Sequence, residues 1–328
     1  MGRDRPEAKM TQEITIDLRR PPEERWRLTP EQRGQARELL ALYKADLGIP
    51  PDLGEFLAAS ARELVRPDHW AELESLSLSV GVPLSDTVLC NFYYDALKVV
   101  IGCTAFAADT ADGVLHARNL DWWTSSAILS RYTLACNFVG GAAGEFTTIG
   151  WPGFTGAFSG VAPGRFAVTL NAVLSLEPAV PAMPVVLTLR SVLEEARSFD
   201  EALSVLSAAS LPSDSLLLLT GTRAGEHAVI ERTPSRCAVR RGQRGFTCVT
   251  NDYRQINVNA ERPLSEVLAT SCGRLKRIEA LLSGAMPRTP EDCFQYLSDP
   301  AVMMRITVQQ MVFHAATGQY WIRLPTAD

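Results

Sequence analysis

The sequence has no long hydrophobic run, no long basic run and few histidines, and each shortage excludes a class of protein. No window holds the roughly eighteen apolar residues that a membrane-spanning helix requires. The net charge is −5 and lysine and arginine form no long cluster, so the composition offers no attraction for nucleic acid. The four histidines are scattered and form no i, i+4 pair, so we expect no metal site.

The seven cysteines are widely spaced and include no C-x-x-C motif. This pattern predicts neither a disulfide framework nor a zinc site, and most of these cysteines are expected to be small buried apolar residues. The first residues lead into charged sequence without an apolar stretch, which predicts no signal peptide and a cytoplasmic protein. No sequence feature calls for a cofactor.

Helical patterns dominate the chain up to about residue 98. Thr29-Pro30-Glu31-Gln32 is a capping box with proline at the first helical position. It predicts a helix to about Leu47, and Asp68 and Ser85 are candidate caps of later helices. The further helices are expected at 52–65, 68–78 and 85–98. A lone alternating strand at 13–18 needs a sheet elsewhere in the chain.

Short strands dominate after residue 103. A hairpin is predicted at 103–109 and 114–121, with Asp112-Gly113 in its turn. Further strands are expected at 131–138, 145–150, 156–160, 165–171, 215–220, 227–232, 236–240, 246–250, 304–313 and 318–323. Helices are expected at 186–208, 271–283 and 290–297. This order predicts an α+β fold with two antiparallel sheets covered by helices. We divide the chain into a helical segment, 1–102, and a catalytic domain, 103–328.

Cys103 opens the first strand of that hairpin, and Arg118 and Asp121 lie on the return strand. Such a thiol fits a nucleophile that becomes a new chain terminus when the Gly102–Cys103 bond is cut. The freed α-amine, with a pKa of about 7.7–8.0, could then take the proton of its own thiol, and no histidine would be required. Taken alone, Cys103 could equally be an inert buried cysteine, and Arg118 and Asp121 a surface ion pair.

The hairpin resembles the choloylglycine-hydrolase-like N-terminal-nucleophile (Ntn) hydrolases, most of all the acid ceramidase and N-acylethanolamine acid amidase group. The resemblance rests on ordered motifs that span nearly the whole chain: 14–18, 21–26, 91–94, 102–104, 116–121, 163–171 and 249–253. It implies the Ntn αββα sandwich, autocatalytic cleavage before Cys103 and an N-terminal fragment that stays associated. It also implies a cysteine amidase without cofactor or metal.

The resemblance assigns roles to further residues. Asp121 would orient the Cys103 amine, and Arg118 would lower the thiol pKa and hold the polar group of the substrate. Because these two residues are three positions apart, an ideal strand puts them on opposite faces. Both can face the site only if the strand ends, twists or bulges near Asn119. Gly102 would tolerate a strained approach to the scissile bond.

The resemblance also supplies an oxyanion hole. Asn251 would donate its side-chain amide, and the backbone or side chain of Asn171 would complete the hole; both asparagines could instead be turn or cap residues. Arg274 is the preferred site arginine and Arg262 its competitor. Arg274 could also belong to a solvated helix face with Lys276 and Arg277.

Aromatic residues among glycines predict a wall for an apolar acyl group, although each could instead be part of the core. They are Trp122, Trp123, Trp151, Phe154 and Phe158. The expected substrate is a small N-acyl amide with a hydrophobic acyl chain, such as a fatty-acid amide, an N-acylethanolamine or a ceramide-like lipid.

Two other functions remain open at this point. The spacing of eighteen residues from Cys103 to Asp121 resembles isopenicillin-N acyltransferase, which passes the acyl group to an amine, whereas Arg118 favours the hydrolases. A non-catalytic scaffold is the third interpretation, and the intact set of site residues argues against it. A homo-oligomer is also left open.

Overall fold

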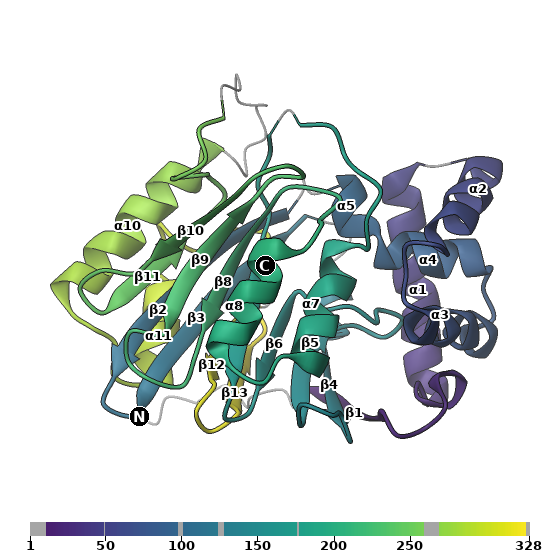
Figure 1. Cartoon of the computed structure of the whole chain (residues 1–328), viewed down its shortest axis with the longest axis horizontal. Coiled ribbons are helices and arrows are strands. Elements are labelled where there is room, and N and C mark those ends of the chain that lie inside the picture. Colours follow the sequence, from purple (N-terminus) through teal and green to yellow (C-terminus); the bar gives the residue numbers. More distant parts are fainter. Residues whose placement is uncertain are drawn as a thin grey trace, which may run out of the picture.

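The computed structural model describes residues 11–48, 50–97, 101–123, 128–175, 177–258 and 269–325. Two β-sheets pack face to face, and helices cover the outer face of each sheet (Figure 1). The expected α+β class and the helix–sheet–sheet–helix order are therefore confirmed.

The first sheet has eight strands in the order β1-β4-β5-β6-β7-β8-β9-β10. Their bounds are β1 (Gln12–Asp17), β4 (Leu134–Val139), β5 (Phe146–Gly150), β6 (Ser159–Ala162), β7 (Phe166–Asn171), β8 (Ser215–Thr220), β9 (His227–Arg232) and β10 (Cys237–Arg241). Neighbouring strands are antiparallel except β1 and β4, which run parallel. The expectation of two purely antiparallel sheets is wrong at this edge. A parallel pair needs a long crossover, and the N-terminal helices and the hairpin supply it.

The second sheet has five strands in the order β11-β2-β3-β12-β13. Their bounds are β2 (Ile101–Thr110), β3 (Gly113–Trp122), β11 (Phe246–Val249), β12 (Thr307–His314) and β13 (Gln319–Arg323). The predicted hairpin is β2 and β3. Gly113 ends its turn with a φ of 132°, where a Cβ would lie 2.7 Å from the carbonyl oxygen of Thr222, so glycine is required there.

The helices that flank the sheets are amphipathic or buried. On the first sheet lie α7 (Val185–Glu195) and α8 (Phe199–Ala208); on the second lie α10 (Ser271–Gly284) and α11 (Pro290–Leu297); α6 (Ile128–Arg131) is a single turn. The single helix expected at 186–208 is two helices. Ala196 is extended, and the Ser198 side chain accepts a hydrogen bond from the Glu201 N–H, which starts a new helix.

The N-terminal segment is helical and lies beside the β1, β4 and β5 edge of the first sheet (Figure 1). It contains a 3-10 turn, η1 (Pro22–Glu24), and the helices α1 (Pro30–Leu47), α2 (Pro51–Ala61), α3 (Pro67–Val80), α4 (Leu84–Asn91) and α5 (Tyr93–Leu97). The Thr29 capping box is confirmed, with both reciprocal hydrogen bonds formed. Asp68 and Ser85 are not caps, because α3 and α4 begin one residue earlier, after Arg66 and Pro83.

One hydrophobic core joins the N-terminal segment to the sheets. Trp26 packs edge-on against Phe138 of β4, and Tyr43 of α1 stacks on Trp122 of β3. The segment therefore packs as part of the sandwich, to which it also contributes β1.

Within the described residues, no helix is both long and apolar enough to cross a membrane.

Candidate active site

Cys103 lies inside β2, where it is paired with Leu120 of β3. Alternation along the strand points its side chain at the first sheet; we call this the inner face of the hairpin and the side under α10 and α11 the outer face. The Cys103 side chain is completely buried, and its thiol donates to the carbonyl oxygen of Leu170 at 3.6 Å. Gly102 lies in regular strand opposite Asp121, so the strained approach expected at Gly102 is not seen in the uncut chain.

Arg118 lies on the same inner face and contacts the thiol. Its Nη2 is 2.8 Å from Cys103 Sγ, and its Nη1 donates to the Phe158 carbonyl at 3.0 Å and to Ser159 Oγ at 2.9 Å. Burial raises the pKa of the Cys103 thiol above its usual value, and the positive charge of Arg118 opposes that rise. The thiol of the uncut chain is therefore protonated at neutral pH, and Arg118 is the cation placed to favour the thiolate.

Asp121 is also fully buried, but on the outer face. Its Oδ1 accepts a hydrogen bond from Thr307 Oγ1 at 2.6 Å, and its Oδ2 has no hydrogen-bond partner among the described residues. Burial raises the pKa of its carboxyl group, and the nearby Arg274 guanidinium at 3.9 Å partly counters this. Strand β3 stays in regular register with β2 to Trp122, so it neither ends nor bulges near Asn119. The register shift lies in β12 instead.

Side chains bind the backbone of Cys103 on the edge of β2 that faces β11, where no strand residue pairs with it. The last residue of β11, Val249, pairs with Ala105, so β11 ends before it reaches Cys103. The Cys103 N–H donates to Asn251 Oδ1 at 3.2 Å, and the Cys103 carbonyl accepts from Arg274 Nη1 at 2.6 Å. These two contacts replace the missing ladder hydrogen bonds.

Asn251 and Arg274 form one buried network. Arg274 Nη2 donates to Asn251 Oδ1 at 2.7 Å, and Arg274 Nη1 donates to Thr104 Oγ1 at 2.8 Å. The Asn251 Nδ2 group donates to the carbonyl oxygen of Ala172 at 2.7 Å. The structure thus brings Arg274 to Cys103. Arg277 pairs with Asp299 at the surface, and Arg262 lies outside the described residues.

Asn171 holds the neighbouring loop. Its Nδ2 donates to the carbonyl oxygens of Val249 and Thr250, at 3.3 and 3.0 Å, so both amide hydrogens are engaged. Its Oδ1 has no hydrogen-bond partner among the described residues. The backbone of the next residue, Ala172, instead supplies a hydrogen bond that lowers the pKa of the Cys103 thiol.

Four of the five predicted wall aromatics are buried in a cluster with the N-terminal helices. Trp122 lies 5.3 Å, ring centre to ring centre, from both Trp151 and Phe158, and Phe154 stacks on Phe158 at 5.2 Å. Tyr43 and Tyr93 close the cluster from the N-terminal segment, whereas Trp123 is exposed. In the uncut chain this cluster is packed as core.

The sequence model of the family AAT, "Acyl-coenzyme A:6-aminopenicillanic acid acyl-transferase", matches residues 108–310. The chain belongs to this family. The matched region carries Arg118, Asp121, Asn171, Asn251 and Arg274 and begins after Cys103.

Several individual proteins are similar in sequence to this AAT-family chain. It is 24% identical over 258 residues to an acid ceramidase of Balaenoptera acutorostrata scammoni, and 26% identical over 238 residues to an N-acylethanolamine-hydrolyzing acid amidase of Caenorhabditis elegans. Each match covers 66% of this chain, and 62% and 66% of the relative, so the chain spans less than two thirds of these relatives. Acid ceramidases of other mammals also match.

A solved structure confirms the fold. The C. elegans N-acylethanolamine-hydrolyzing acid amidase ortholog superposes with a TM-score of 0.56 at 23% sequence identity, over 68% of this chain and all of that chain. The AAT-family chain therefore has the Ntn-hydrolase sandwich that the sequence motifs predicted.

Sequence reasoning missed the residues that support the site from a distance. Thr307 binds Asp121, and Ser159 binds Arg118. Each is an ordinary serine or threonine in a strand, and no local motif distinguishes it. The register of β12 against β3 brings Thr307 to the site, and the packing of the first sheet on the hairpin brings Ser159 there.

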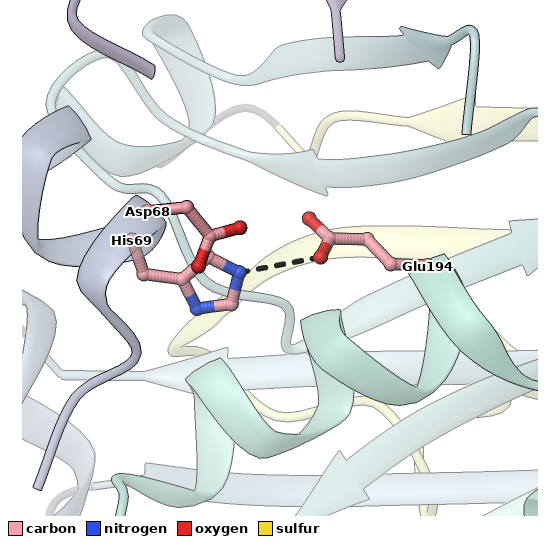
Figure 2. Close-up of side chains that lie close together, drawn as sticks. All are labelled: Asp68, His69 and Glu194. Atoms are coloured by element: carbon pink, nitrogen blue, oxygen red, sulfur yellow. Dashed lines mark hydrogen bonds and ion pairs between the residues drawn. The ribbon is translucent and has the colours of Figure 1, made fainter. Parts of the chain in front are cut away.

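One cluster in the described part of the chain has metal-ligand chemistry, and it lies at the N-terminal segment. Asp68, His69 and Glu194 have ligand atoms within 4.8 Å of one another (Figure 2). Arg66 binds Asp68 at 3.3 Å and Arg190 binds Glu194 at 2.9 Å, so the carboxylates already have cationic partners. The cluster reads as an ion-pair contact between α3 and α7.

Proposed function

We propose that this protein is a self-processing cysteine amidase that hydrolyses a linear N-acyl amide through a thioester on Cys103. The proposal rests on one observation: the thiol and the backbone N–H of Cys103 are bound by different side chains. The Cys103 thiol contacts Arg118 at 2.8 Å, while the Cys103 N–H contacts Asn251 at 3.2 Å and is one residue from the position opposite Asp121. An N-terminal nucleophile needs its side chain and its amine positioned separately, and this arrangement provides both.

The first reaction cuts the chain. The Cys103 thiol attacks the carbonyl carbon of Gly102, the Gly102–Cys103 C–N bond breaks, and the acyl group moves from nitrogen to sulfur. Water then hydrolyses this thioester, which leaves a carboxylate on Gly102 and a free amine and thiol on Cys103. The product is an N-terminal segment, 1–102, bound to the catalytic domain, 103–328.

The second reaction uses the new amine. It takes the thiol proton, the thiolate attacks the amide carbonyl of the substrate, and the protonated amine gives its proton to the leaving nitrogen. Water then hydrolyses the acyl-thioester to a carboxylic acid. A free α-amine has a pKa of about 7.7–8.0, which suits a general base near neutral pH.

The side chains around Cys103 suggest a role for each. Asp121 Oδ2 is an acceptor for the new ammonium, because it is buried and accepts no hydrogen bond among the described residues, while Arg274 Nη1 lies 3.9 Å away. Arg118 stabilises the thiolate, and Asn251 donates to the oxyanion once its amide turns from Ala172 to the substrate. Asn171 and Arg274 hold Asn251 in place through their contacts with its loop and its Oδ1.

The substrate we propose is a small acyl amide with a hydrophobic chain, such as an N-acylethanolamine or a ceramide-like lipid. The names of the acid ceramidase and N-acylethanolamine-hydrolyzing relatives support this class, as does the aromatic cluster beside the site. Trp122, Trp151 and Phe154 would border the acyl chain, and Trp123 the entrance. The name of the N-acylethanolamine-hydrolyzing relative also favours water over an amine as the final acyl acceptor.

Intact mass spectrometry tests the first reaction. Wild-type protein incubated over a range of pH should yield a fragment that begins at Cys103, and Cys103→Ala should yield none. Cys293→Ala, which removes another fully buried thiol on α11, is the matched control and should be cut normally. A single uncut chain at every pH would refute self-processing.

A second assay tests the second reaction. Cut protein is mixed with an N-acylethanolamine, with and without a free amine acceptor, and the products are separated by mass. We expect free fatty acid in both mixtures. An acylated acceptor as the main product would identify an acyltransferase instead.

A further inference from the structure

The guanidinium of Arg118 is held by the end of one loop. Residues 151–158 connect β5 to β6, and the last carbonyl of this loop, Phe158 O, together with the following Ser159 Oγ, accepts both hydrogen bonds of Arg118 Nη1. The other nitrogen, Nη2, is on the thiol. The position of this loop therefore decides where the cation lies relative to Cys103.

Asn91, the last residue of α4, binds the middle of the loop. Its Nδ2 donates to the Gly153 carbonyl at 3.0 Å and to the Thr87 carbonyl at 2.9 Å. Its Oδ1 accepts from the Thr155 N–H at 2.7 Å and from Thr155 Oγ1 at 3.0 Å. The side chain is 1% exposed, and all of its hydrogen-bonding capacity is used. This asparagine belongs to the segment before the proposed cut.

A second contact, from Arg190 of α7, holds the other side of Thr155. The Thr155 carbonyl accepts from Arg190 Nη1 at 3.2 Å, and Arg190 is paired with the buried carboxylate of Glu72 on α3. His69, one turn earlier on α3, binds Glu194 on the same helix as Arg190 (Figure 2). The backbone of Thr155 is thus fixed at its N–H by Asn91 and at its C=O by a cation that Glu72 orients.

Two glycines of the loop pack closely against neighbouring helices. Gly153 has a φ of 90°, and a Cβ there would lie 3.3 Å from Ala36 of α1. A Cβ on Gly156 would lie 2.8 Å from Val186 of α7. The loop is therefore packed between the N-terminal segment and α7, and its shape depends on both.

We propose that Asn91 is a positioning residue for the Cys103 thiol, acting from the other side of the scissile bond. It fixes the 151–158 loop, the loop fixes Arg118, and Arg118 stabilises the thiolate. This inference rests on the proposed function. It makes the N-terminal segment a working part of the mature enzyme.

The test follows the thiol directly. Processed wild-type protein and Asn91→Ala are alkylated with iodoacetamide across a range of pH, and modification of Cys103 is measured by peptide mass spectrometry. We expect the alkylation profile of the variant to move to higher pH and kcat to fall on the order of tenfold or more, with a smaller change in KM. Simple loss of packing would lower the melting temperature without moving the pH profile.

The matched control is Asn137→Ala. Asn137 of β4 also links the sheet to the N-terminal segment, through Glu13 of β1 at 3.4 Å, but it does not touch the loop. It should leave the alkylation profile unchanged. If Asn91→Ala does not fold, Asn91→Asp keeps the size and the Oδ1 acceptor and loses the two donors, and it should show the same shift.

The possible outcomes distinguish the proposed role of Asn91 from the proposed role of Cys103 as the nucleophile. An Asn91 variant that melts like wild type but is cut slowly supports the inference, because cleavage uses the same thiol. Normal cleavage with an unshifted alkylation profile in a folded variant overturns it. Wild-type Cys103 that is neither cut nor alkylated overturns the proposed nucleophile itself.

Discussion

The two faces of the β2–β3 hairpin bind different parts of the same cysteine. On the inner face, Arg118 contacts the Cys103 thiol, and two threonines hold the neutral His116. On the outer face, Asp121 lies beneath α10 and α11, while Asn251 and Arg274 bind the Cys103 backbone where β11 has ended. The sheet therefore separates the group that contacts the sulfur of Cys103 from the groups that contact its backbone.

This difference gives the three-residue spacing of Arg118 and Asp121 a meaning. Odd spacing in a regular strand sends two side chains to opposite faces. A nucleophile that carries its own base needs one charged group near its thiol and another near its amine. Under the proposed function, a single undistorted strand would supply both.

Removal of the outer carboxylate should have the largest effect. Asp121→Asn keeps the shape but loses the negative charge that would face the Cys103 ammonium, so kcat for amide hydrolysis should fall by about 10²- to 10⁴-fold, the usual contribution of acid–base groups. Steady-state kinetics on cut protein measures this. Activity near that of wild type would mean that the outer face does not control the amine.

Removal of the inner cation should have the next largest effect. Arg118→Met leaves the buried thiol without the charge that opposes its raised pKa, so kcat should fall by about 10- to 100-fold. The alkylation profile of Cys103 should move to higher pH. Lys276→Met, on the exposed side of α10, is a control that changes the same charge and should show neither effect.

The contributions of the two faces to stability should change in opposite directions as the pH falls. His116 on the inner face should destabilise the fold, and Asp121 on the outer face should stabilise it. Burial lowers the pKa of His116 to about 3 from 6.5, so the unfolded chain takes up a proton below pH 6.5 that the folded chain refuses. Stability is lost as the pH falls through this window, at about 1.4 kcal/mol per pH unit, or about 2 kcal/mol by pH 5. Asp121 has a raised pKa, so the folded chain takes up its proton first and gains stability on acidification.

Urea unfolding at several pH values checks this contrast. His116→Gln should flatten the loss of stability between pH 6.5 and 5. Asp121→Asn should remove the gain in stability that protonation of Asp121 gives on acidification. Equal pH profiles for the two variants would show that the faces do not differ in this way.

The smallest expected effect comes from Thr307. Thr307→Val removes the hydrogen bond to Asp121 Oδ1 and keeps the shape, so kcat should fall about fivefold, the equivalent of about 1 kcal/mol. Thr317→Val, in the exposed turn after β12, is the control. An unchanged kcat would indicate that Arg274 alone orients Asp121.

Local patterns predicted much of this fold. The Thr29 capping box and the Asp112-Gly113 turn each depend on a few neighbouring residues, and both formed as expected. The parallel pairing of β1 with β4 was not predictable, because the two strands are more than 100 residues apart and share no motif.

The site shows the same division. The hairpin motif predicted that Cys103 and Arg118 lie close together, since both are in adjacent strands. The position of Asn91 against the 151–158 loop depends on how α4 packs beside the first sheet, which no periodicity encodes. The aromatic residues were ambiguous for a related reason, because a core and a binding wall have the same composition.

Strand β1 has a consequence for the lifetime of the cut protein. It pairs along its whole length with β4, while the other end of the N-terminal segment enters the second sheet at Ile101. After cleavage the N-terminal fragment would remain paired with the catalytic domain at both of its ends, through β1 and through Ile101. The enzyme would then be a heterodimer made from one polypeptide. Its unfolding would then separate two molecules, and the melting temperature of the cut form, unlike that of the uncut form, should rise with protein concentration.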